Sequence, residues 1–164
     1  MDARRKWRAS PRKSNFNTWP AEMMEKINFH DGKITSISVN DKDFSIKIVT
    51  ANDKLVTIDF LNTIALRVSD FSIQNIISRV MFSSNNDFSE QGLISCLSWV
   101  TSYSDSKSWL KQEKLLDVMK SLQSGTSELI VFEPSAGAEI ACVCKKTIMQ
   151  ISQDKTEHRH ASSR

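Results

Sequence analysis

The stretch ITSISVNDKDFSIKIVTANDKLVTIDFL, residues 34–61, decides the fold class. The first run, ITSISV (34–39), is β-branched, apolar side chains alternate with polar ones in the second and third runs, and Asn/Asp-rich turns at 40–42 and 51–54 separate the runs. The second and third runs present Phe44, Ile46, Ile48, Val56, Ile58 and Phe60 at the apolar positions. Such alternation between short turns is typical of antiparallel strands with one buried face. We therefore predict an antiparallel β meander in which Ile46 and Ile58 are buried.

The same period continues C-terminally, as far as residue 82. The set that we expect to face inward there is Ile64, Leu66, Val68, Ile76, Val80 and Phe82. Two further strands are therefore predicted, with Leu66 and Val80 buried at the inward phase.

Beyond residue 88 the period changes. One helix is predicted over 104–125, ended by Gly125 in the left-handed conformation. Its apolar stripe would be Trp109, Leu115, Leu116, Met119 and Leu122. Residues 89–103 fit either a helix capped by Ser89 or a strand. SELIVFEP (127–134) is predicted as a strand ended by Pro134, and AEIACVCKKTIMQI (138–151) as one final strand. The fold class expected is α+β, a meander with one or two helices packed on one face.

Charge divides the chain into a body and two tails. The net charge of +3 comprises +5 in residues 1–17, +1 in residues 151–164, and −3 between them. We expect a disordered basic arm (1–17), a single α+β domain (18–151) and a disordered tail (152–164). Trp19, which precedes Pro20, is expected to pin the N-terminal edge of the domain.

No apolar run approaches the roughly 20 residues that span a bilayer, and the basic N-terminus has no apolar segment of a secretory signal behind it.

Few residues of the body suggest chemistry. His30-Asp31 could mark a metal or acid–base site, but the other histidines lie in the tail, so a structural turn is favoured. Ser135 lies in a predicted turn with little support for a triad, and no phosphate-binding glycine loop is present. The three cysteines are expected to be free thiols. We therefore predict no enzyme activity, no cofactor and no metal.

Two adjacent amides, Gln74-Asn75, stand where an apolar strand begins. Asn and Gln side chains can bond backbone groups, so these two are predicted to fix a neighbouring loop.

Three segments together resemble a known family. They are W-x9-F-H-D-G-K-I-T-S-I (Trp19 to Ile37), D-F-S-I-Q-N-I-I (Asp70 to Ile77) and E-P-S-A-G-A-E-I-A-C-V-C (Glu133 to Cys144). The chain resembles the small immunity proteins of bacterial polymorphic-toxin and contact-dependent inhibition systems, the immunity protein 50 type above all. The likeness is carried mainly by residues 19–82. It implies a cytoplasmic protein that binds a cognate toxin domain and neutralises it by occlusion, with a nuclease as one candidate toxin.

The acids of the predicted turns are the candidate contact residues. Asp41, Asp43 and Asp53 are expected to gather at one end of the meander, where they could meet a basic cleft on the partner. The alternative function is nucleic-acid association through the basic arm, which would show as salt-dependent binding lost on deletion of residues 1–17. A third possibility is an enzyme built on His30 and Asp31.

Overall fold

The computed structural model describes residues 27–103 and 107–153, so the expected basic arm lies outside the described residues. The elements in chain order are β1 (Lys33–Asn40), β2 (Asp43–Val49), β3 (Lys54–Leu61), β4 (Ala65–Ser69), β5 (Ile76–Phe82), the short 3₁₀ helix η2 (Ser83–Asn85), α1 (Glu90–Val100), α2 (Gln112–Gln123), β6 (Glu128–Ala136), β7 (Glu139–Cys144) and β8 (Lys146–Gln153). The expected α+β class is confirmed. Strand β8 runs two residues into the range expected as the C-terminal tail; residues 154–164 are outside the described part.

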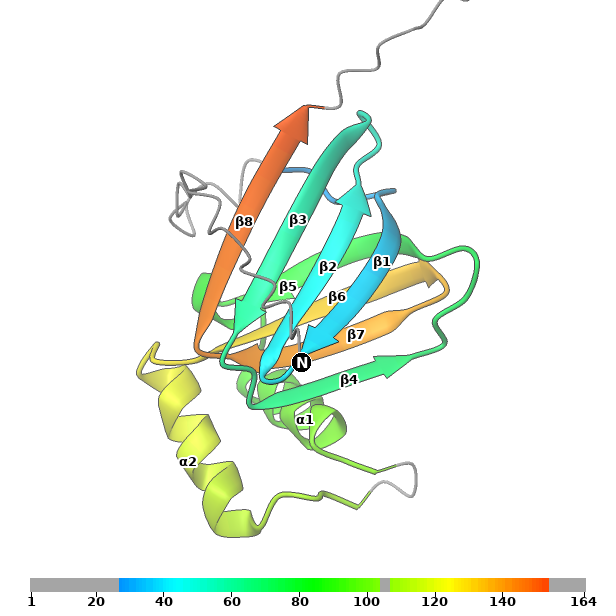
Figure 1. Ribbon diagram of the computed structural model, residues 1–164. Helices are drawn as coiled ribbons and strands as arrows, with labels where there is room; N and C mark the ends of the chain where they lie inside the picture. Colours follow the sequence, from blue (N-terminus) through cyan, green and yellow to red (C-terminus); the bar gives the residue numbers. More distant parts are fainter. Residues whose placement is uncertain (1–26, 104–106, 154–164) are drawn as a thin grey trace, which may run out of the picture.

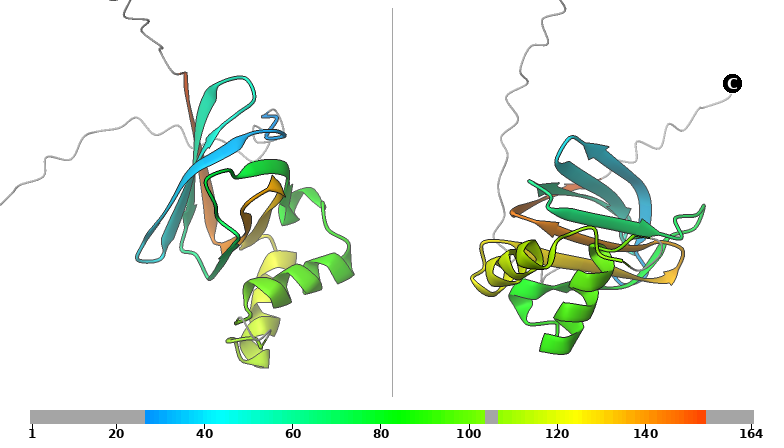
Figure 2. Two further views of the ribbon diagram at one scale, coloured as in Figure 1. Left: turned by 90° about the vertical axis from the view of Figure 1, so that its right-hand side faces the viewer. Right: turned by 90° about the horizontal axis from the view of Figure 1, so that it is seen from below.

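The strands form one antiparallel sheet in the order β4-β7-β6-β5-β1-β2-β3-β8. Strands β1 and β5 pair through a single residue pair, Lys33 with Ile76. The sheet folds at this narrow joint, so that β1, β2, β3 and β8 form a first leaf and β5, β6, β7 and β4 form a second leaf (Figures 1 and 2). The predicted antiparallel meander is present in β1–β2–β3, but β4 does not continue it, because β4 pairs with β7.

The main core lies between the two leaves. Ile46 and Ile58 are fully buried there, as predicted, and the aromatic rings join the leaves: Phe60 stacks on Phe44 at 5.3 Å and meets Phe132 edge-on at 6.3 Å. Leu66 and Val80 pack against this core but are only partly buried, because both lie toward its margin.

Strands β6 and β7 are buried on both faces. Successive residues Leu129, Ile130, Val131 and Phe132 alternate between the main core and a second one. The second core joins α1 and α2 to the outward side chains of β4, β6 and β7. Continuous apolar runs are what such doubly covered strands require, and this explains ELIVF and IACVC in the sequence.

Residues 89–103 turn out to be helical over α1. Ser89 is the N-cap, with its hydroxyl accepting the Gly92 N–H at 3.1 Å. Arg67 of β4 holds the other end, because its Nη1 donates to the carbonyl oxygens of Trp99 (3.0 Å) and Ser102 (3.1 Å) while its guanidinium lies over the Trp99 ring. The sheet therefore supplies a cation to the carbonyl end of α1.

The predicted apolar stripe of α2 is partly wrong. The helix begins at Gln112, so Trp109 lies before it and is 39% exposed, and Leu116 is 56% exposed. Leu122 of the predicted stripe is buried in the second core, and Leu115 and Met119 pack against that core as expected. Val118, which the stripe did not include, is buried there as well. Gly125 follows the C-cap with φ +70°, as predicted.

Three strand predictions are also corrected. Pro134 lies within β6, beside the bulges of β5, where a missing ladder donor is tolerated. The segment 138–151 is two strands rather than one, because the chain crosses at Lys145 from the second leaf to the first. The β5 bulges also shift its phase, so that Ile77 (1% exposed) rather than Ile76 enters the core.

Candidate functional site

The three predicted contact acids do not gather at one end. Asp41 lies in the β1–β2 turn and Asp43 begins β2, whereas Asp53 lies in the β2–β3 turn at the other end of that strand. Successive turns of a meander alternate between its ends, so this expectation is wrong for geometric reasons. All three side chains are exposed; Asp41 (φ +54°) and Asp53 (φ +56°) have the left-handed backbone of tight turns.

Asp43 has a structural partner. Its Oδ1 accepts the N–H of Asn62 at 3.0 Å, which ties the start of β2 to the loop after β3. Beside it, a hollow of about 370 Å³ on the outer face of the first leaf also includes Asp59. Asp59 in turn accepts from Gln150 Nε2 at 3.4 Å. Asp43 and Asp59 therefore already accept hydrogen bonds from other residues of the first leaf and the loop after β3.

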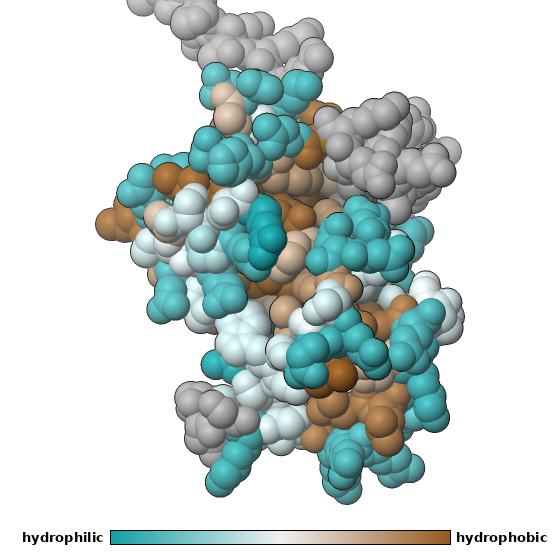
Figure 3. Space-filling view, turned by 180° about the vertical axis from the view of Figure 1, so that it is seen from behind, coloured by the Kyte–Doolittle hydropathy of each residue, from teal (hydrophilic) through white to brown (hydrophobic). Residues whose placement is uncertain are grey.

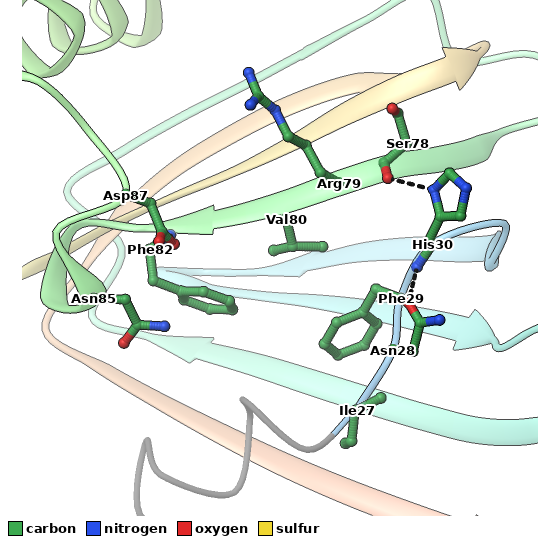
Figure 4. Close-up of a pocket in the computed structure, with 10 residues that line it drawn as sticks. All are labelled: Ile27, Asn28, Phe29, His30, Ser78, Arg79, Val80, Phe82, Asn85 and Asp87. Atoms are coloured by element: carbon green, nitrogen blue, oxygen red, sulfur yellow. Dashed lines mark hydrogen bonds between the residues drawn. The ribbon is translucent and has the colours of Figure 1, made fainter.

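His30 and Asp31 form a turn that joins the two leaves. The Asp31 N–H donates to the carbonyl of Ile77 (3.0 Å), and the Ile77 N–H donates back to the carbonyl of Gly32 (2.9 Å). The His30 ring is exposed, and its Nδ1 donates to the Ser78 carbonyl at 2.8 Å (Figure 4). This geometry agrees with the structural interpretation of the pair.

The thiols of Cys142 and Cys144 lie side by side in the main core. The hydrogen bond to Cys144, together with burial, raises the pKa of Cys142 well above its usual range. Ser135 is exposed, and its hydroxyl bonds the carbonyl of Ile76 at 3.4 Å. No group of three or more His, Cys, Asp or Glu side chains that could hold a metal ion occurs within residues 27–103 and 107–153.

The loop between β4 and β5, residues 70–75, is held by Asn75. This amide is 2% exposed; its Oδ1 accepts the N–H groups of Ser72 (2.9 Å) and Ala138 (3.1 Å), and its Nδ2 donates to the Ser72 carbonyl (2.7 Å). The Asn75 carbonyl accepts from Ile34 of β1 at 2.9 Å. One side chain thus ties the 70–75 loop to the β6–β7 turn, and the predicted loop-fixing role of the Gln74-Asn75 pair is confirmed for Asn75.

The β6–β7 turn is shaped to receive this loop. A Cβ on Gly137, which has φ +79°, would lie 2.2 Å from the carbonyl oxygen of Gln74 and 2.6 Å from Oδ1 of Asn75. Ser72 adds a second constraint, because its hydroxyl donates to the Gln74 carbonyl at 2.8 Å. The 70–75 loop is therefore defined at both its tip and its base.

This well-anchored loop presents two apolar side chains to solvent. Ile73 is 98% exposed and Phe71 is 46% exposed. The loop projects at the right of Figure 1, and on the corresponding side of the rear view, at its left, apolar residues protrude from the surface (Figure 3). Sequence reasoning missed both residues, because their spacing in DFSIQNII matches the inward phase of a strand.

Two acidic residues lie at the start of the loop. Asp70 is exposed at the start of the loop with φ +55°, and Glu139 is the register partner of Ser69, next to it. The loop therefore carries an exposed carboxylate together with exposed apolar side chains, a combination suited to a protein surface with an apolar hole and basic surroundings.

Comparison with protein-family models, with curated proteins and with solved structures finds no match for this chain. Within the described part of the chain, no helix has both the length and the apolar character needed to cross a membrane.

Proposed function

We propose that this protein is a cytoplasmic inhibitor that binds a cognate toxin domain through the 70–75 loop and neutralises it by occlusion. The observation that carries the proposal is Ile73, which is almost fully exposed on a loop that Asn75 holds in one conformation. A flexible loop could turn such a side chain inward, whereas this loop holds it outward.

Pre-organisation is the physical advantage of the loop. Ordering a flexible segment on binding costs free energy, and a loop already ordered avoids that cost. Burying Ile73 and the exposed part of Phe71 against a partner would contribute about 1.5–3 kcal/mol for each full side chain. Anchors of this kind account for most of the affinity at protein interfaces.

The acids give the partner its expected charge. Asp70 directly precedes Phe71 and is exposed, and Glu139 lies opposite Ser69 at the base of the loop, so a basic rim on the partner would complement them. Many nucleases have basic clefts for their substrate, so a nuclease toxin fits this chemistry. Asp41, Asp43 and Asp53 stay predicted contributors through long-range attraction, since they cannot all meet one small surface.

Co-expression with a toxin domain encoded next to this protein tests the proposal. The wild-type chain should restore growth and form a one-to-one complex with the toxin domain. Ile73→Asp should abolish rescue and weaken the complex at least about 100-fold, because a charge would enter an apolar contact. Leu116→Asp is the matched control, since Leu116 is also exposed but lies on α2, and it should rescue normally.

Two results would overturn the proposal. One is a toxin that stays fully active at saturating wild-type protein with no complex detected. The other is an Ile73→Asp variant that rescues as well as Leu116→Asp, which would remove the 70–75 loop from the interface.

A further inference from the structure

The outer edge of β5 carries an open stretch of backbone. Strand β5 pairs with β6 over most of its length, but it pairs with β1 only at Ile76. On this outer side Ile77 bonds the 31–32 turn, and the Phe82 N–H donates to Asp87 Oδ2 at 2.8 Å. Val80 lies between them in the same phase as Phe82, so the alternation of the ladder turns its N–H and C=O outward too. No described residue pairs with either group.

A hollow of about 250 Å³ adjoins this edge. Its apolar lining is Ile27, Phe29, Val80 and Phe82, which point toward one another in Figure 4. Asn85 and Asp87 stand at one end of the hollow and His30 at the other, while Arg79 points away and pairs with Glu133. Water that fills the hollow would lie against these four apolar side chains. An apolar side chain is the better occupant.

The chain itself supplies a suitable segment. The described part begins at Ile27, whose side chain forms one wall of the hollow, so residues that precede it start out beside the site. Residues 19–24, WPAEMM, contain one charged residue, whereas residues 1–17 contain seven. Eight residue steps separate Trp19 from Ile27, which allows a span of up to roughly 27 Å, more than enough to fold back along β5.

We infer that Trp19–Met24 lies along the free edge of β5, with its backbone paired to Val80 and the Trp19 indole in the hollow. Pro20 favours an extended conformation at Trp19, as strand pairing requires. The indole would bury a large apolar area in the hollow. The segment thereby covers an open sheet edge that would otherwise be a template for another chain. The inference is independent of the proposed function.

Amide hydrogen exchange on the full-length protein tests the inference. The Val80 N–H should exchange slowly in the wild-type chain, and roughly 30-fold or more faster in Trp19→Ala, because the loss of a buried aromatic frees the segment. Trp7→Ala is the matched control and should leave the rate unchanged. The Ile58 amide, central in the first leaf, should keep its rate in both variants, which excludes general unfolding. Trp19→Phe should retain most of the protection.

Three outcomes would overturn the inference. The first is a Val80 amide that exchanges at the unprotected rate in the wild-type chain. The second is an unchanged Val80 rate in Trp19→Ala. The third is protection that increases with protein concentration, since the occupant would then be a second copy of the chain.

Discussion

Replacing Asn75 by alanine should release the 70–75 loop. The substitution removes the amide that accepts from Ser72 and Ala138 and donates to the Ser72 carbonyl. The fold of both leaves should persist, because the hydrophobic clusters do not include Asn75. The expected result is a less stable protein whose exposed loop no longer has one conformation.

The magnitude follows from which partners stay buried. Ala138 is 2% exposed, so its N–H would be left without a partner, at about 1–3 kcal/mol. Ser72 is exposed, so water replaces its two bonds at a net cost of about 0.5–1 kcal/mol each. The free energy of unfolding should therefore fall by about 2–5 kcal/mol, or roughly 4–20 °C in Tm for a chain of this size.

Urea denaturation and thermal melts measure this change. Gln74→Ala is the matched control, because Gln74 is exposed and contributes its backbone carbonyl to the loop; it should stay within about 0.5 kcal/mol of wild type. Amide exchange at Ser72 should also accelerate in Asn75→Ala alone. A free energy of unfolding within about 0.5 kcal/mol of wild type for Asn75→Ala would show that the Asn75 side chain does not stabilise the 70–75 loop.

Ile58→Asp should cost about 4 kcal/mol or more in urea denaturation, because the residue is fully buried; unchanged stability would show that the strand phase is wrong. Arg67→Ala should destabilise by about 1.5–3 kcal/mol and Arg67→Lys by less, since the planar guanidinium serves two carbonyls at the end of α1; equal melts for both variants would contradict this role. Because the pKa of Cys142 is raised by its bond to Cys144 and by burial, the folded thiol stays protonated while the unfolded one ionises, so the free energy of unfolding should decline as pH rises past about 8.5 in reducing buffer. Cys142→Ala should flatten that decline, and an unchanged slope would count against it. His30→Ala should lower stability by no more than about 1 kcal/mol, because its bond is solvent-exposed, and stoichiometric metal binding lost in this variant would overturn the structural interpretation of His30.

Local pattern was sufficient for the elements themselves. The alternation in residues 34–61 identified three strands and the burial of Ile46 and Ile58, because a strand with one covered face needs apolar residues at every second position. Ser89 and Gly125 marked helix ends for equally local reasons of backbone bonding and conformation. The role of Asn75 was also accessible, since two adjacent amides where an apolar strand begins can bond nearby backbone groups.

Local pattern could not predict which distant segments of the chain pair with one another. A run such as 138–151 reads as one strand until its two halves pair with different leaves, and the bulges of β5 depend on its register with β6. The same holds for the candidate site: Phe71 and Ile73 have the spacing of core residues, yet lie outside.

The sequence by itself determined the local conformations and the alternation of the strands, since these depend on neighbouring residues and on the period of the backbone. Only the tertiary structure decided which apolar residues stayed exposed, that Asp53 lies far from Asp41 and Asp43, and that the edge of β5 is open beside Ile27. Whether a side chain is exposed, and which residues lie near it, depends on how segments far apart in the chain pack together. In this protein the two leaves of the sheet meet at the single pair of Lys33 and Ile76, and the packing between the leaves follows from that joint.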